Sequence, residues 1–465
     1  MACLAHVGVG LSTPRTVAVI GAGWAGCAAA VELAAHGASV ILLEASEELG
    51  GRARRVPLVL AGQSHLLDNG QHLLLGAYNE TAALFELLNV APAAVINQRP
   101  FELRYPDGFC LQAARLPAPW HLAAALVAAR GMNIRDRKAM VRLLRALKSA
   151  HWKIGSDRST TDWLIERKQT PHVIRRVWRP LALAALNTPL DRASAQIFAN
   201  VLRDSLGASS AASEMWVPRA DLSALLPDAV ERYVVAQGGQ VRRDARVERV
   251  TRNDRFHVQL RNEPDRTIEA DAVVYAAPPA YLERVSGPNA ALAPVFETVA
   301  RFEYEPLYTV YLKYSPGVRV ARGLMALLDD PAKRRYAQWV FDRGALDRRN
   351  DGILAAIISS SGPHEAESLE DVCQAVAAQL TDDLNLPPPL DARAIAERRA
   401  TLAAVPDLKR VPNSTTWPGF VLAGDWTESG YPSTLETAVR SGRSAARLLM
   451  TEDAARGRYD GAARL

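Results

Sequence analysis

The chain has 465 residues, of which 49% are hydrophobic and 23% are charged, an ordinary composition for a globular protein with room for two or three domains. Its formal net charge of +5 comes from basic residues spread along the whole length, which argues against a face for nucleic acid. Anionic lipid remains a candidate partner.

The cysteines and the first residues predict a protein of a reducing compartment. Cys3, Cys27, Cys110 and Cys373 are too few and too scattered for a disulfide framework or a zinc site. Residues 1–14 lack the charged start and hydrophobic core of a secretory signal, and no apolar run reaches the roughly 20 residues that span a bilayer. We therefore expect a cytoplasmic protein that is at most peripheral at the inner membrane face.

A strand, a glycine-rich turn and a helix open the chain. The apolar run 17–20 predicts a buried strand, and a helix is predicted over 24–36. Gly21 and Gly23 permit a tight turn whose backbone N–H groups approach a pyrophosphate, and Gly26 lets the helix pack against the strand. The helix directs its positive N-terminus at the phosphates. The predicted cofactor contacts here are Gly21, Gly23, Trp24, Ala25 and Gly26.

An acidic residue completes this nucleotide motif. Glu44 lies 23 positions after Gly21 (44 − 21), at the end of the apolar run 39–43, and Ala45 follows it. Its carboxylate can accept hydrogen bonds from both ribose hydroxyls of an adenosine, and its charge disfavours a 2′-phosphate. The expected ligand is FAD or NAD. The alternative, glycines that bind nothing, is weakened by the helix and the acid at the expected distances.

Gly50-Gly51-Arg52 favours FAD over NAD. This segment resembles the double-glycine-arginine sequence that follows the ribose-binding acid in the amine oxidase and carotenoid desaturase flavoproteins. Gly51 would contact the cofactor, and Arg52 would neutralise pyrophosphate charge with its planar guanidinium. The alternative for Arg52 is a solvated arginine like its neighbours Arg54 and Arg55.

A second strand-to-helix junction lies near the C-terminus. Residues 421–423 predict a strand, Gly424 permits a close approach, and Asp425 can accept a hydrogen bond from a ribityl or phosphate-side hydroxyl. A helix over 434–449 would point its N-terminus at the flavin O2 region and stabilise negative charge there. The alternative is a plain junction with a capping aspartate. The predicted contacts here are Gly424, Asp425, Ser433 and Thr434.

Four motifs give the chain a specific resemblance. They are 67–78 (LDNGQHLLLGAY), 216–223 (WVPRADLS), 420–427 (FVLAGDWT) and 431–442 (YPSTLETAVRSG). Together they resemble the hydroxysqualene dehydroxylases, also called squalene-associated FAD-dependent desaturases, over nearly the whole chain after residue 14. Relatives often carry small residues at 428–429 and a leucine at the position of Tyr431.

The resemblance implies a reaction and the state of the cofactor. Hydroxysqualene, an isoprenoid allylic alcohol, would be reduced to squalene by reduced FAD, so an electron donor for FAD is implied as well. In covalently flavinylated amine oxidases a cysteine precedes the last helix, whereas Tyr431 and Pro432 stand there in this chain. Noncovalent FAD is therefore implied.

The loop Asn69-Gly70-Gln71-His72 passes the flavin in the relatives, so all four residues are candidate cofactor contacts. His72, beside Gln71 and Asn69, is the candidate proton donor for the departing hydroxyl, because imidazole titrates near neutrality. The alternative is a His72 that only hydrogen-bonds FAD or the backbone. Asp68 is expected to hold this loop rather than to react.

Because the flavin motifs lie at both ends of the chain, we predict an α/β fold whose Rossmann-like FAD-binding domain is assembled from discontinuous segments. This domain is predicted over 14–78, 211–285 and 413–450. A substrate domain of sheet and helices, similar to that of the amine oxidases, is predicted over 79–210 and 286–412.

The middle of the chain contributes to both domains. A helix is predicted over 221–238, with strands at 240–243, 245–251, 256–260 and 272–275. Val247 resembles the valine whose backbone clamps the adenine in this superfamily. The predicted elements of the substrate domain are a hairpin at Asp107-Gly108, strands at 307–314, 336–341 and 353–359, and a helix at 369–384.

Three other functions compete with the dehydroxylase. They are a carotenoid or phytoene desaturase, an amine oxidase, and a noncatalytic flavin-binding scaffold. The 69–72 motif favours the dehydroxylase over the first two, and the intact flavin motifs argue against the scaffold.

Residues 121–153 join an apolar Ala-Leu stretch to basic residues and predict a basic amphipathic helix that could rest on a bilayer. The alternative is a solvated helix face. The basic residues are Arg135, Arg137, Lys138, Arg142, Arg145 and Lys148. Four tryptophans fit the core as well as the lining of a substrate tunnel: Trp163, Trp178, Trp216 and Trp339.

Overall fold

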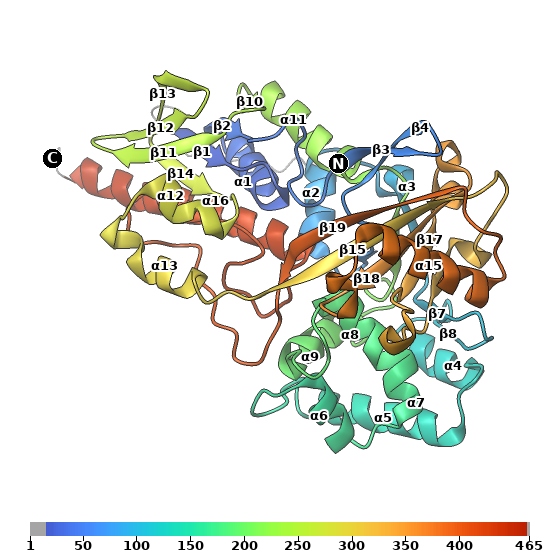
Figure 1. Ribbon diagram of the computed structural model, residues 1–465. Helices are drawn as coiled ribbons and strands as arrows, with labels where there is room; N and C mark the ends of the chain where they lie inside the picture. Colours follow the sequence, from blue (N-terminus) through green and yellow to red (C-terminus); the bar gives the residue numbers. More distant parts are fainter. Residues whose placement is uncertain (1–14, 463–465) are drawn as a thin grey trace, which may run out of the picture.

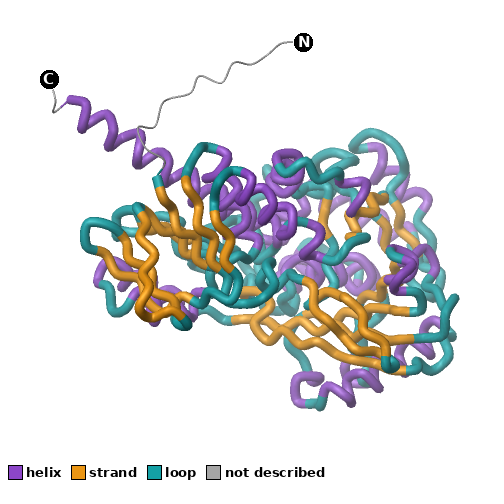
Figure 2. The backbone as a smooth tube through the Cα atoms, turned by 90° about the horizontal axis from the view of Figure 1, so that it is seen from above, coloured by secondary structure: helices purple, strands orange, loops and turns teal. Residues whose placement is uncertain are grey.

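The protein is built around two large sheets, seen at the upper left and the right of Figure 1, with a helical lobe below them. The structure, a computed structural model, describes the backbone of residues 15–462 and the side chains of residues 15–451. Cys3 and the segment 1–14 lie outside the described residues. Figure 2 shows the strands gathered in two groups, with loops between them.

The first sheet is parallel and takes its strands from both ends of the chain. Its order is β10(Gln240–Arg242), β2(Ser39–Leu43), β1(Thr16–Ile20), β14(Ala272–Tyr275) and β20(Phe420–Leu422). In β1, Val17 and Val19 face one core, whereas Ala18 and Ile20 face another. Burial on both faces explains why the inner strands β1 and β14 are mostly apolar runs. The predicted Rossmann-like α/β class is confirmed.

Helices cover one face of this sheet and a small antiparallel sheet covers the other. The helices α1(Trp24–Ala35), α11(Pro227–Ala236) and α16(Leu435–Ala462) pack together, with α1 against both of the others. The second layer consists of β11(Val247–Arg252), β12(Phe256–Leu260) and β13(Glu263–Ala270). The carboxyl ends of β1 and β2 therefore lie next to the start of α1 and the residues that follow Glu44.

The second large sheet is antiparallel. Its order is β16(Leu324–Ala326), β17(Trp339–Asp342), β18(Ile353–Ser359), β15(Tyr304–Lys313) and β19(Asp391–Leu402). Alternate residues of β18 face opposite cores: Leu354 and Ile358 pack toward α15(Leu369–Leu384), and Ile353 and Ile357 pack toward the helical lobe. This period of two is the pattern of a strand buried on both sides.

The first insertion supplies the helical lobe, and three small sets of strands lie within it or beside it in the chain. Its helices are α2(Asn79–Leu87), α3(Pro92–Val95), α4(Trp120–Ala128), α5(Ile134–Ser149), α6(Thr160–Glu166), α7(Pro171–Val173), the π-helical turn Ile174–Trp178, α8(Arg179–Leu186) and α9(Ala195–Asp204). The strands are the hairpins β3(Arg55–Leu60) with β4(Gln63–Asp68) and β7(Glu102–Arg104) with β8(Cys110–Gln112), and the set β5(Leu74–Leu75), β9(Met215–Pro218) and β6(Ile96–Arg99). The hairpin at Asp107-Gly108 is thereby confirmed.

The remaining short helices connect the sheets. They are α10(Leu222–Leu225), α12(Leu282–Ser286), α13(Ala293–Val299) and α14(Arg343–Leu346). The sheets agree with the discontinuous assembly, and we retain the boundaries 14–78, 211–285 and 413–450 for the FAD-binding domain, and 79–210 and 286–412 for the substrate domain, as a proposal.

Two predicted helices are wrong in detail. The single helix expected over 221–238 is two helices, α10 and α11, because Pro227 starts the second and Leu226 before it leaves helical geometry, with φ −139° and ψ −59°. The amphipathic helix expected within 121–153 is also two helices, α4 and α5, separated by residues 129–133.

Candidate active site

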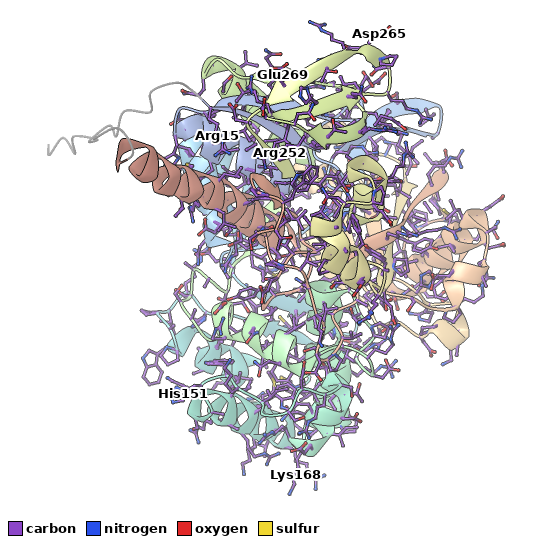
Figure 3. All side chains as sticks on the ribbon, turned by 90° about the vertical axis from the view of Figure 1, so that its left-hand side faces the viewer. Arg15, His151, Lys168, Arg252, Asp265 and Glu269 are labelled. Atoms are coloured by element: carbon purple, nitrogen blue, oxygen red, sulfur yellow. The ribbon has the colours of Figure 1, made fainter. Side chains whose placement is uncertain are left out.

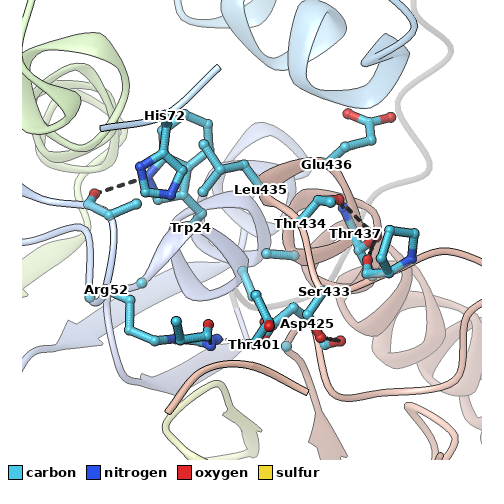
Figure 4. Close-up of a pocket in the computed structure, with 18 of the residues that line it drawn as sticks. Trp24, Arg52, His72, Thr401, Asp425, Ser433, Thr434, Leu435, Glu436 and Thr437 are labelled. Atoms are coloured by element: carbon cyan, nitrogen blue, oxygen red, sulfur yellow. Dashed lines mark hydrogen bonds and ion pairs between the residues drawn. The ribbon is translucent and has the colours of Figure 1, made fainter. Parts of the chain in front are cut away.

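One large pocket, of about 810 Å³, is lined by residues of both large sheets and brings the dispersed motifs together. Figure 4 shows His72 and Trp24 facing the same space as Arg52, Asp425 and Thr434. The predicted residues that line it are Gly21, Gly23, Trp24, Ala25, Glu44, Ala45, Gly51, Arg52, Gln71, His72, Val247, Gly424, Asp425, Ser433 and Thr434. Three predicted residues do not line it: Gly26, Asn69 and Gly70.

The glycine turn is shaped for a close approach of backbone to ligand. A Cβ on Gly26 would lie 1.9 Å from the carbonyl oxygen of Gly21, so α1 can begin this close to β1 only with glycine at that position. Gly51 has a φ of +62°, and a Cβ there would lie 3.1 Å from the Cα of Gly23. Gly26 therefore supports the turn, while Gly21, Gly23 and Gly51 line the pocket, and their contact with a pyrophosphate remains a prediction.

Glu44 is fixed at the edge of the pocket by the protein itself. Its Oε2 accepts a hydrogen bond from the backbone N–H of Ala22 at 2.9 Å. Its Oε1 accepts hydrogen bonds from the backbone N–H and the hydroxyl of Ser46, at 3.0 and 2.9 Å. A carboxylate has about four acceptor positions, so this one keeps capacity for ribose hydroxyls. The residue fits the predicted role.

Arg52 is paired with an acid, while 42% of its side chain remains exposed. Its Nη2 lies 2.5 Å from Oδ1 of Asp425, and its Nη1 donates to the carbonyl of Ala400. Arg55, which the alternative treated as solvated, contacts Asp228 and Asp221 and is itself mostly buried. The pair of Arg52 with Asp425 joins the two flavin motifs, and contact of Arg52 with pyrophosphate remains a prediction.

The N-terminus of α16 faces the pocket. Thr434 caps this helix, because its hydroxyl accepts a hydrogen bond from the N–H of Thr437 at 3.2 Å. The Ser433 hydroxyl donates to the carbonyl of Asp425 at 3.2 Å. The alternative of a capping aspartate is wrong, since the carboxylate of Asp425 is engaged with Arg52.

Hydrogen bonds hold the buried side of the loop 68–72 in place. The Asp68 side chain is fully buried, and its Oδ1 accepts a hydrogen bond from the N–H of Leu222 at 2.7 Å. Asn69 turns away from the pocket and donates to the carbonyl of Arg52 at 3.1 Å. Burial raises the pKa of Asp68 to about 6, although the positive charge of Arg343 opposes the shift. Asp68 holds the loop, as expected.

His72 presents one defined nitrogen to the pocket. Its Nδ1 lies 2.7 Å from the carbonyl oxygen of Gly70, which can only accept, so Nδ1 carries a proton. In the neutral ring the other nitrogen, Nε2, is therefore an acceptor. Burial lowers the pKa of His72, and the charge of Arg52 lowers it further. The ring can donate a proton from Nε2 only in the imidazolium form.

The substrate side of the pocket is largely apolar. Its wall includes Phe101, Leu181, Phe198, Trp339, Phe341 and Ile357. Of the four tryptophans considered, Trp339 lines the pocket, whereas Trp163, Trp178 and Trp216 belong to the buried core.

Two groups were missed by the sequence analysis. The hydroxyl of Tyr431 donates to Asp204 and lies 2.7 Å from Nη2 of Arg203. These two contacts join α9 to the C-terminal loop. Arg343 contacts Gln71 from the substrate domain. Arg343 belongs to no local motif, whereas Tyr431 opens the motif 431–442 and departs from the leucine of the relatives, so it could have been singled out for that reason.

Other chemistry finds little support in the part of the chain that the structure describes. There, no three His, Cys, Asp or Glu side chains gather as a metal site would require, and the described cysteines are buried and unpaired. None of these cysteines lines the pocket. No helix of the described chain is long and apolar enough to cross a membrane.

Comparison with known proteins agrees with this geometry. Residues 24–450 match the family described as flavin containing amine oxidoreductase, and the chain belongs to that family. It is an FAD-dependent oxidoreductase. A solved oxidoreductase from Methanosarcina mazei has the same fold, with a TM-score of 0.72, 16% identity and coverage of 93% of this chain and 100% of its own.

More specific likenesses come from curated proteins. The chain is 30% identical to a hydroxysqualene dehydroxylase of Rhodopseudomonas palustris, over 94% of this chain and 98% of that protein. It is 22% identical to a 15-cis-phytoene desaturase of Capsicum annuum, over 94% of this chain and 78% of that protein. The resemblance to hydroxysqualene dehydroxylases that the motifs predicted is confirmed.

Proposed function

We propose that this protein reduces hydroxysqualene to squalene. The observation that carries the proposal is a single pocket that joins the complete set of flavin motifs to an apolar wall, in a chain similar to a hydroxysqualene dehydroxylase over nearly the full length of both. In the reaction an allylic C–O bond breaks, a C–H bond forms, and the hydroxyl takes a proton and leaves as water. Reduced FAD, when bound, supplies the hydride.

Residues of the chain bind the cofactor, hold the substrate and face its hydroxyl. The glycine turn and Glu44 bind the nucleotide half of FAD, and the N-terminus of α16 stabilises negative charge at the ring. The apolar wall, including Phe198 and Trp339, holds an isoprenoid chain and excludes water. His72, which lines the same pocket, would face the hydroxyl. Because no described cysteine reaches the pocket, we propose that FAD is held noncovalently.

An anaerobic assay separates this function from its rivals. Protein whose FAD has been reduced with dithionite is mixed with hydroxysqualene, and extracts are analysed for squalene by gas chromatography. We expect squalene only with the reduced protein. A desaturase would instead form a new double bond in phytoene with oxidised FAD, and an amine oxidase would reduce its flavin with an amine. Either of those results without squalene would replace the proposal.

We also propose a peripheral contact with anionic lipid through α4 and α5. The exposed fractions are 66% for Trp120, 75% for Val127 and 72% for Ile134, high for large apolar side chains. The segment 108–135 contains no acidic residue and carries Arg115, Arg130 and Arg135. Apolar groups flanked by arginines suit the surface of an anionic bilayer.

The setting of the protein follows from these proposals. FAD must be reduced again after each turnover, so an external electron donor is required. A cytoplasmic location, peripheral at the inner membrane face, would bring the pocket to a substrate that dissolves in lipid.

A further inference from the structure

A buried arginine contacts the loop that carries His72. Arg343, the first residue of α14 in the substrate domain, has a side chain that is only 1% exposed. Its Nη1 donates to Oε1 of Gln71 at 2.9 Å, and its Nη2 lies 3.7 Å from Oδ2 of Asp68. Among the described residues, its Nε has no hydrogen-bond partner. Arginine is seldom buried to this degree without a specific counter-group.

The contact with Gln71 fixes the orientation of that side chain. A guanidinium only donates, so the carbonyl oxygen of the Gln71 amide must face Arg343. The amide nitrogen therefore points the other way, where it donates to the backbone carbonyl of His72 at 3.1 Å. Gln71 and His72 both line the pocket. Arg343 thus acts on the pocket wall through one intervening side chain.

Substrate-domain strand β15 holds the same loop from behind. The Tyr311 hydroxyl donates to the carbonyl of Asp68 at 2.9 Å. The N–H of Gln71 donates to the hydroxyl of Thr309 at 3.3 Å. These contacts fix the backbone of the loop, whereas the contact from Arg343 is the one that orients the side chain of Gln71.

We infer that Arg343 is a positioning residue, which orients Gln71 and through it sets the position of the His72 ring at the pocket wall. This inference rests on the proposed function only where turnover is measured. Arg343 is not a catalytic residue, since it does not line the pocket.

The positive charge of Arg343 also favours the ionised form of the buried Asp68 carboxyl group. Burial raises the pKa of Asp68 to about 6, and the opposing influences are Arg343, the N–H of Leu222 and Arg55, while Asp221 adds to the rise. The neighbouring Tyr311 hydroxyl donates a hydrogen bond to the backbone carbonyl of Asp68. Removal of Arg343 raises the pKa of Asp68 further, so the carboxyl becomes protonated at a higher pH.

The test compares Arg343→Met and Arg343→Lys with a matched control in the FAD-loaded protein. Arg335→Met is the control, because Arg335 is also an arginine paired with an acid, Asp383, but is less buried than Arg343 and does not line the pocket. Two quantities are measured: the pH titration of the His72 ring by NMR, assigned by its loss in His72→Ala, and the pH profile of single-turnover squalene formation.

In Arg343→Met we expect bound FAD, an altered His72 titration and a rate lower by roughly 10²-fold, the usual effect of a displacement of about 1 Å. On the acidic side of the pH profile, the fall in rate should move to higher pH, because the Asp68 carboxyl is protonated at a higher pH without Arg343. Arg343→Lys should recover part of both effects, and Arg335→Met should match the unaltered protein. A His72 titration in Arg343→Met equal to that of the unaltered protein would overturn the inference.

If Arg343→Met does not fold, the double variant Asp68→Asn/Arg343→Met replaces it, because it removes both buried charges and still leaves Gln71 without its donor. The same change in His72 titration is expected, and its absence refutes the inference. If the unaltered protein makes no squalene, the proposed function fails, while the NMR titration still decides the role of Arg343.

Discussion

Glu44 shows how one carboxylate can serve both the protein and the cofactor. It is already oriented by Ala22 and Ser46, so FAD meets a fixed acceptor. Glu44→Ala should weaken FAD binding by about 1.5–3 kcal/mol, the worth of a charge-assisted hydrogen bond, as measured by equilibrium dialysis. Glu47→Ala, which removes an exposed acid three residues further on, should bind FAD normally. Full flavin in Glu44→Ala after long dialysis would count against the assignment.

His72 can be assigned by combining flavin content, rate and pH. If it is the acid, His72→Ala should keep FAD and lose a factor of roughly 10²–10⁴ in single-turnover squalene formation. The pKa of His72 is lowered, so the acidic form exists only below the ordinary histidine range, and the rate of the unaltered protein should fall as pH rises through that pKa.

Two other outcomes for His72→Ala would contradict that role. Loss of FAD with a normal rate in the flavin-loaded fraction would make His72 a cofactor contact. A normal rate with normal flavin would assign the proton to water or to another group, such as Tyr431 with Asp204.

The sequence alone identifies those candidate site residues that belong to contiguous motifs. Gly21, Glu44 and Asp425 were found because each stands at a fixed offset from a strand. Arg343 and Asp204 were missed, because they reach the loop 68–72 and Tyr431 only through tertiary contacts across 272 and 227 positions of the chain.

Helices α4 and α5 form the element on which the lipid proposal depends. In Figure 3, His151 and Lys168, which follow α5 and α6, lie at the end of the molecule opposite Asp265. Changing Arg142, Arg145 and Lys148 to Glu should reduce co-sedimentation with anionic liposomes, because each basic residue near such a surface contributes about 1 kcal/mol. Trp120→Ser should reduce it further.

The control for this prediction lies at the opposite end of the molecule. Arg249, Arg261 and Arg266 are exposed on the small antiparallel sheet, and their change to Glu alters the net charge by the same amount. It should leave sedimentation much closer to normal. Equal sedimentation of both triple variants would show that only net charge matters and would refute the docking surface.

Elements with a strong apolar period were predicted well, and charged elements were not. Strands β12 and β18 match their predicted bounds because their buried residues form clear runs. Strand β19 was missed because the alternating residues on its packed face, Ala392, Ala394 and Ala396, are small and stand among charged residues, and it is held by its pairing with β15 at the sheet edge. Strand β13, which is mostly exposed, was missed for the same reason.

On the scale of the molecule, the pocket exists only when distant segments meet. The parallel sheet places β20 beside β14, which brings Asp425 to Arg52, and the second sheet closes the substrate side with Trp339. The class of fold could be read from the order of the motifs. The shape of the pocket could not, since it depends on how two sheets and a helical lobe pack.

Hydride transfer from reduced FAD in this pocket to hydroxysqualene can be measured in an anaerobic single turnover. Flavin absorbance and squalene are followed together, with no other reductant present. We expect hydroxysqualene to reoxidise the flavin, with one squalene formed for each FAD oxidised. Flavin that stays reduced in the presence of hydroxysqualene, with no squalene formed, would contradict this expectation.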